Sequence, residues 1–237
     1  MKHVIVFTLI VLVVSAFAFG QKKPAEDLPK CALRLDQSPE LRGFRMGMTE
    51  TTVLAKLPGV TIEKPNKFGL ARLRISLIDT SGLIKASAKD RAVQPDITAS
   101  PEEGSAFVID VGRFPAFKGV RRMQMRFIDG RLSYLEVTYD DAIKWESLDQ
   151  FIDTVSTTLK LPKDWQRGED AGDQEKELRC DGFVLTASTS GDAADVHAGP
   201  ELILQDTAAW NAMSKRQNDV VEKAKQDDAE KRKAFKP

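Results

Sequence analysis

The chain has 237 residues, of which 42% are hydrophobic and 30% charged, and its 35 basic residues balance its 35 acidic ones. This composition is typical of a folded protein and leaves enough chain for one large domain or two small ones. Because the charges balance, the composition gives no general attraction to nucleic acid or to anionic lipid. We therefore expect no nucleic-acid partner.

The first 20 residues predict a secretory signal peptide. Met1–His3 is a short basic start, residues 4–19 are apolar apart from a Thr and a Ser, and small residues precede a cut after Gly20. This apolar run is shorter than the roughly 20 residues of an ordinary membrane span. We expect a periplasmic or secreted protein with no membrane span after cleavage. An uncleaved N-terminus that tethers the protein to a membrane is the alternative.

Two cysteines, Cys31 and Cys180, lie in the part of the chain that is expected to be exported. Disulfides persist outside the cytoplasm, and two cysteines allow one pairing, so we predict a Cys31–Cys180 disulfide. Two buried free thiols are the alternative. A polar spacer over residues 21–30 separates Cys31 from the apolar run, which argues against lipidation.

The first half of the predicted domain contains one short helix and several strands. Thr49 is a good N-cap, and Pro58-Gly59 ends the helix that follows it. Apolar residues alternate with polar ones over 71–77, as in a strand with one wet face, and a strand resumes at Phe107. Residues 80–104 lack any periodicity and predict a long surface loop.

The second half is marked by two hairpin turns and a stronger helix. Asp129-Gly130 and Asp181-Gly182 each separate two alternating segments, which predicts two hairpins. A capping box over 147–150 begins a helix whose apolar face ends at Leu159. A short strand over 202–204 comes last.

The order of these elements predicts an α+β fold: a meandering antiparallel sheet with helices packed on one face and a charged C-terminal helix. We expect a single domain over residues 31–206 and a helix or tail over 207–237 that docks through Trp210 and Met213. A degenerate repeat of the two halves is an alternative that the residues alone leave open.

Two segments carry a resemblance to known families. Residues 43–49, Gly-Phe-Arg-Met-Gly-Met-Thr, lead into a short helix that ends at Pro58-Gly59, and residues 127–132 read Phe-Ile-Asp-Gly-Arg-Leu. The chain resembles the SmpA/OmlA (BamE-like) envelope proteins, the beta-lactamase inhibitor protein fold and uncharacterised secreted bacterial proteins. The resemblance implies a binding or scaffolding module built from helices on an antiparallel sheet.

No motif predicts an active site or a cofactor. His197 is the one histidine after the signal segment, and it fits a surface loop better than a catalytic triad or a zinc site. Asp140-Asp141 fits a polar strand exit, although a hydrolase that uses acidic residues remains the alternative. Phosphate-binding and dinucleotide-binding glycine loops are absent from the sequence, so we expect no metal and no cofactor.

Arginines alternate with apolar residues in two of the predicted strands. Alternate charged positions protect a sheet from aggregation, but they also suit an acidic or anionic partner. The candidate partner-binding residues are Arg72, Arg74, Arg122 and Arg126. We expect a non-catalytic binding or scaffolding module for an unknown protein or envelope component.

Overall fold

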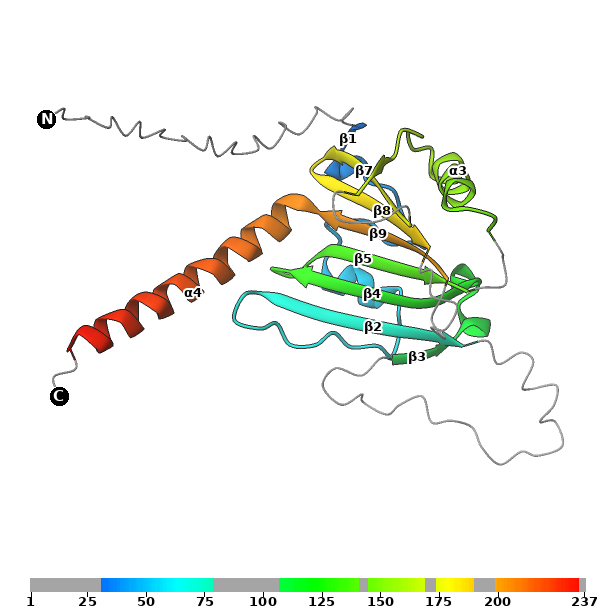
Figure 1. Cartoon of the computed structure of the whole chain (residues 1–237). Coiled ribbons are helices and arrows are strands. Elements are labelled where there is room, and N and C mark those ends of the chain that lie inside the picture. The colour runs from blue at the N-terminus through cyan, green and yellow to red at the C-terminus, as the bar shows by residue number, and fades with distance from the viewer. Residues whose placement is uncertain (1–30, 79–106, 141–144, 169–173, 190–198, 235–237) are drawn as a thin grey trace, which may run out of the picture.

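The computed structural model describes residues 31–78, 107–140, 145–168, 174–189 and 199–234, which form one sheet with helices around it (Figure 1). The predicted signal peptide, the spacer, the loop over 80–104, Asp141 and His197 lie outside these ranges. In the described part of the chain, no helix is long and apolar enough to cross a membrane.

The sheet has nine strands in the described residues and is mixed. Its order is β1-β7-β8-β9-β5-β4-β2-β3, and β6 pairs with β7. The strands are β1 (Cys31–Arg34), β2 (Leu70–Ile78), β3 (Phe107–Asp110), β4 (Val120–Ile128), β5 (Arg131–Tyr139), β6 (Gln166–Arg167), β7 (Glu175–Asp181), β8 (Phe183–Thr189) and β9 (Pro200–Asp206).

The α+β class is confirmed, but the expected wholly antiparallel meander is wrong at both edges of the sheet. β1 pairs with β7 in parallel, and so does β2 with β3. Parallel neighbours cannot be joined by a hairpin and need a long connection. Residues 79–106 supply that connection between β2 and β3, where the sequence shows no periodicity from which a parallel return can be predicted.

Three α-helices and three short 3-10 turns accompany the strands in the described residues. They are η1 (Leu35–Gln37), α1 (Glu50–Ala55), η2 (Val111–Arg113), η3 (Pro115–Phe117), α3 (Leu148–Leu159) and α4 (Thr207–Ala234). Both predicted caps are confirmed. The Thr49 side chain accepts from the Thr52 amide at 3.3 Å, and the Ser147 side chain accepts from the Gln150 amide at 3.2 Å.

One face of the sheet carries the main hydrophobic core. On β4, Met123, Met125 and Phe127 are fully buried, and their partners on β2 and β5 are apolar as well. Val53 of α1 and Phe151 of α3 belong to the same cluster of buried residues. The predicted period-2 alternation of these strands is thus confirmed.

The C-terminal helix α4 packs outside the main core. Met213 of α4 forms a second, smaller cluster with Leu70 and Ile128, and residues 218–233 are exposed as the helix projects from the sheet (Figure 1). The prediction that the helices pack on one face is therefore not confirmed. The sparse apolar residues of α4 cover only one end of the sheet, because its remaining sequence is charged and polar.

The predicted disulfide is present between Cys31 of β1 and Cys180 of β7. The two residues are also register partners in the parallel β1–β7 pair. The bridge thus holds the first described strand against a late one across a sequence separation of 149 residues.

Replacing both cysteines by serine should lower the free energy of unfolding by about 3–5 kcal/mol, because a bridge that closes so long a loop restricts the unfolded chain strongly. Urea unfolding of the Cys31→Ser, Cys180→Ser variant and of the oxidised protein measures this loss. The unreduced, unfolded protein should show no alkylatable thiol by mass spectrometry. Two alkylated cysteines would contradict the bridge.

Gly69 lies against the turn that joins β4 to β5 and has a φ of +78°. A Cβ there would collide with the Asp129 carboxylate. We expect Gly69→Ala to cost about 2–3 kcal/mol, since it combines a strained backbone with this clash. Gly130→Ala is the matched control: its φ is +75°, but its Cβ would meet nothing within 4 Å. Equal losses in urea unfolding would show that Asp129 moves aside freely.

Candidate functional site

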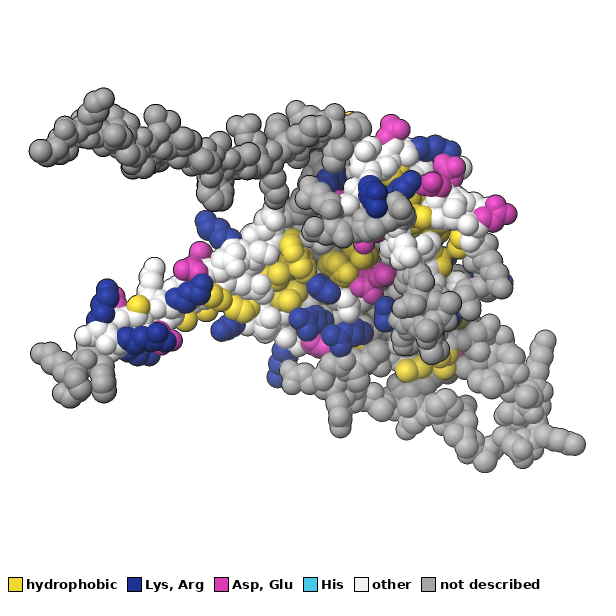
Figure 2. Space-filling view, viewed as in Figure 1, with side chains coloured by type: hydrophobic (Ala, Val, Ile, Leu, Met, Phe, Trp, Pro, Cys, Tyr) yellow, Lys and Arg dark blue, Asp and Glu magenta, His cyan; other side chains and the backbone are white. Residues whose placement is uncertain are grey.

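The four candidate arginines lie on the sheet face opposite the main core. The antiparallel register of β2 and β4 places Arg72 opposite Arg126, Arg74 opposite Gln124, and Ser76 opposite Arg122. Figure 2 shows basic side chains gathered over these strands near the start of α4. The structure therefore brings all four predicted residues to one surface.

Two of these arginines belong to a network around Glu136 of β5. Glu136 as a residue is 9% exposed, and its carboxylate accepts hydrogen bonds from Tyr134 Oη at 2.9 Å and from Gln124 Nε2 at 3.2 Å. Arg122 Nη2 lies 3.4 Å from its other oxygen, and Arg74 Nε donates to Gln124 Oε1 at 3.3 Å. The Glu136 charge is thus compensated within the sheet, and Arg122 is its counter-ion.

The other two arginines, Arg72 and Arg126, form no ion pair within the described part of the chain. The Arg126 guanidinium instead lies 4.3 Å from the ring centroid of Tyr134 and 5.5 Å from that of Trp210. Its Nε is buried without a hydrogen-bond partner. We call Arg72, Arg126, Tyr134 and Trp210 the arginine–aromatic patch.

A second carboxyl lies beside Glu136. Glu201 of β9 lies near Glu136, and partial burial together with the Glu136 charge raises the pKa of Glu201 to about 7. Glu201 therefore keeps a proton to a higher pH than an ordinary glutamate does. Burial, followed by the nearby Glu136 charge, also raises the pKa of Tyr134.

A cavity of about 440 Å³ lies on the other side of the sheet, between α3 and the end of β5. Three aromatic side chains form part of its wall: the Phe151 ring makes edge contacts with Tyr139 at 5.8 Å and with Trp145 at 5.3 Å between centroids. The Arg42 guanidinium lies 5.2 Å from the Tyr139 centroid. Lys118, Thr158 and the acidic residues Glu40 and Asp140 also line the cavity.

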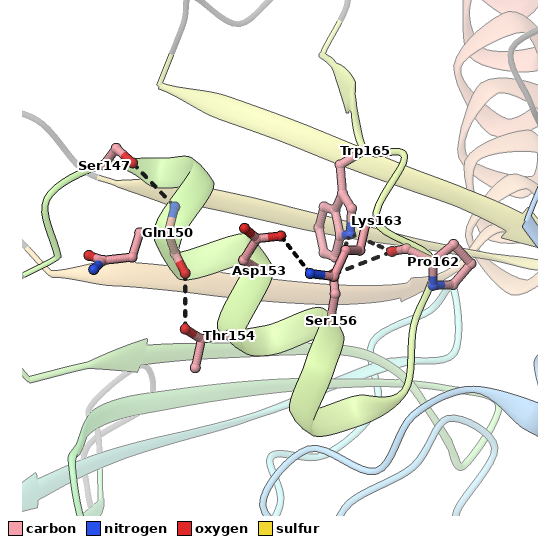
Figure 3. Close-up of polar contacts among 8 residues, drawn as sticks. All are labelled: Ser147, Gln150, Asp153, Thr154, Ser156, Pro162, Lys163 and Trp165. Carbon is pink, nitrogen blue, oxygen red and sulfur yellow. Dashed lines mark hydrogen bonds and ion pairs between the residues drawn. The ribbon is translucent and has the colours of Figure 1, made fainter.

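The helix that forms one wall of this cavity is fixed at both ends (Figure 3). At its start, Ser147 is the N-cap. At its end, Trp165 Nε1 donates to Ser156 Oγ at 3.0 Å and to the Pro162 carbonyl at 3.1 Å. Lys163 lies 3.2 Å from Asp153 across the same turn. These contacts hold α3 in place, so the wall of the cavity is largely preformed.

Glu136, Glu201 and Arg42 are among the residues of these surfaces that were not predicted from the sequence. The alternation of Glu136 with Leu135 and Val137 assigns it to the polar face. Only the pairing of β5 with β9, however, places it beside Glu201. In the described ranges, no cluster of three or more His, Cys, Asp or Glu side chains is suited to hold a metal ion.

The chain matches no protein-family model, no curated protein and no solved structure.

Glu201 should make stability depend on pH. Its folded pKa of about 7 exceeds its ordinary value of 4.5, so the folded protein retains a proton that the unfolded chain releases between these values. The free energy of unfolding should therefore fall as the pH rises from 4.5 to 7, by on the order of 1 kcal/mol after solvent screening.

Glu201→Gln should remove this loss, so that the variant gains stability relative to the parent between pH 5 and pH 8. Urea unfolding at a series of pH values measures the difference. Glu146→Gln is the matched control, since Glu146 is an exposed carboxylate outside the network. A parent and a Glu201→Gln variant with parallel pH profiles would contradict the assignment.

Proposed function

We propose that this chain is an exported, non-catalytic binding module that binds an acidic segment of a protein partner through the arginine–aromatic patch. The observation that carries the proposal is the pair Arg72 and Arg126, which face each other across β2 and β4 and form no ion pair with any residue that the structure describes. Like charges directly opposite each other on neighbouring strands are destabilising. A carboxylate from a partner would relieve this repulsion.

The chemistry of the patch suits protein recognition. Arg, Tyr and Trp are the residues enriched among those that dominate binding energy at protein interfaces. The Arg126 side chain is already ordered by two aromatic rings, so less side-chain entropy is lost on binding. The exposed Arg72 guanidinium can donate charge-assisted hydrogen bonds to a carboxylate.

The disulfide fits the proposed location, because such bridges persist in oxidising compartments such as the periplasm and the extracellular space. A hydrolase has less support. Its two neighbouring carboxyls, Glu136 and Glu201, lie on the open face of the sheet, and Glu136 is already held by Arg122 and Tyr134.

The test uses two fluorescein-labelled ten-residue peptides, one rich in Glu and one rich in Lys, each with a single Phe. We expect fluorescence anisotropy to show micromolar binding of the acidic peptide that weakens with added salt, and no binding of the basic one. Arg72→Glu with Arg126→Glu should reduce the affinity at least tenfold. Arg72→Glu alone, at an exposed site, should reduce it several-fold while leaving the fold unchanged.

Arg45→Glu is the matched control, because Arg45 is exposed and lies outside the patch. It should change the affinity less than twofold. Equal binding of both peptides, or equal losses at Arg45 and Arg72, would overturn the proposal.

A further inference from the structure

We infer that the cavity between α3 and the end of β5 binds a small organic carboxylate with an aromatic or alkyl body, and that Arg42 binds its carboxylate. This site is separate from the arginine–aromatic patch and does not depend on the function proposed for that patch. The volume of about 440 Å³ lies within the range of small-molecule sites, which are mostly apolar with a few polar groups that orient the ligand.

The apolar part of the cavity selects the body of the ligand. Tyr139, Trp145 and Phe151 form a continuous edge-to-face arrangement, and Leu202 of β9 adds aliphatic surface. Aromatic walls of this kind favour a ring or an alkyl chain. Because α3 is held at both ends, little ordering is required when a ligand enters.

Arg42 is the residue that indicates a carboxylate at the polar end of the ligand. It occupies a two-residue turn between Leu41 and Phe44, where its φ is +53° and that of Gly43 is +90°. Turns with two positive φ values favour Asn-Gly or Gly-Gly, and a long side chain at the first position costs about 1 kcal/mol. Backbone strain of this kind is concentrated at functional sites.

The Arg42 side chain has donors to spare. Its Nη1 donates to the Ala116 carbonyl at 3.3 Å, and its guanidinium lies over the Tyr139 ring. A guanidinium has five N–H donors in a planar fork that matches a carboxylate. Within the described ranges, no carboxylate forms an ion pair with Arg42. An anionic ligand would therefore interact with the positive charge of Arg42 and accept hydrogen bonds from its free N–H groups.

Glu40 and Asp140, which also line the cavity, make an amine the competing ligand. Three compounds with the same body therefore form the test: 4-phenylbutyrate, 4-phenyl-1-butanol and 4-phenylbutylamine. By isothermal titration calorimetry with the full mature chain at neutral pH, the carboxylate should bind most tightly and the amine most weakly.

The decisive variant is Arg42→Asn, because Asn suits the turn and removes the guanidinium. It should weaken binding of 4-phenylbutyrate at least tenfold and change binding of the alcohol less than twofold. Thr158→Trp, at an exposed position that lines the cavity, should fill the space and abolish binding of both. Arg45→Asn is the matched control and should leave all three affinities unchanged.

Trp145 provides an independent readout of position. Addition of 4-phenylbutyrate should change the intrinsic fluorescence of the parent protein and of a Trp210→Phe variant. The change should be much smaller in a Trp145→Phe variant. The inference is overturned if the amine binds most tightly, if Arg42→Asn weakens the acid and the alcohol equally, or if no compound binds at millimolar concentration.

Discussion

The turn at Asp129 and Gly130 is the constraint on which the rest of the structure depends. Its two positive φ values set the pairing of Phe127 with Leu132 and of Ile128 with Arg131, and the register then shifts by one residue between Phe127 and Arg126. Three other elements are attached to the turn. The Asp129 amide donates to the Gly69 carbonyl at the start of β2, and the Glu50 amide at the start of α1 donates to the Gly130 carbonyl. Arg216 of α4 pairs with the Asp129 carboxylate at 2.9 Å. One tight turn therefore aligns three strands and two helices.

This register gives the sheet one apolar face, which forms the core, and one polar face, which carries the arginines. A slip of one residue would turn every side chain of β4 to the opposite face. Met125 would then leave the core, and Arg126 would enter it. In the observed register, α1 and α3 pack on the core face, while α4 packs on the polar face at one end of the described part of the sheet. The Glu136 network lies on the polar face, where Arg122, Gln124 and Tyr134 stabilise the Glu136 carboxylate.

Local signals in the sequence predicted what depends on near neighbours in the chain. The caps at Thr49 and Ser147 and the hairpin at Asp129 are set by a few adjacent residues, and the disulfide follows because two cysteines allow one pairing. The parallel edges of the sheet could not be predicted, since they depend on which distant strands meet. The same holds for the site: the alternation around Arg126 indicates its face, but only the pairing of strands brings Tyr134 and Trp210 to its guanidinium.

The central strand β5 links the two candidate sites and also keeps them apart. Tyr134 points to the arginine–aromatic patch, whereas Tyr139, near the other end of the strand and on the core side, lines the cavity. β5 is hydrogen-bonded on both sides, to β4 and to β9, so it cannot shift without breaking two ladders. Coupling between two sites requires an element with two stable arrangements. A strand that is hydrogen-bonded on both edges has a single arrangement. A ligand in the cavity and a partner on the patch would therefore bind independently.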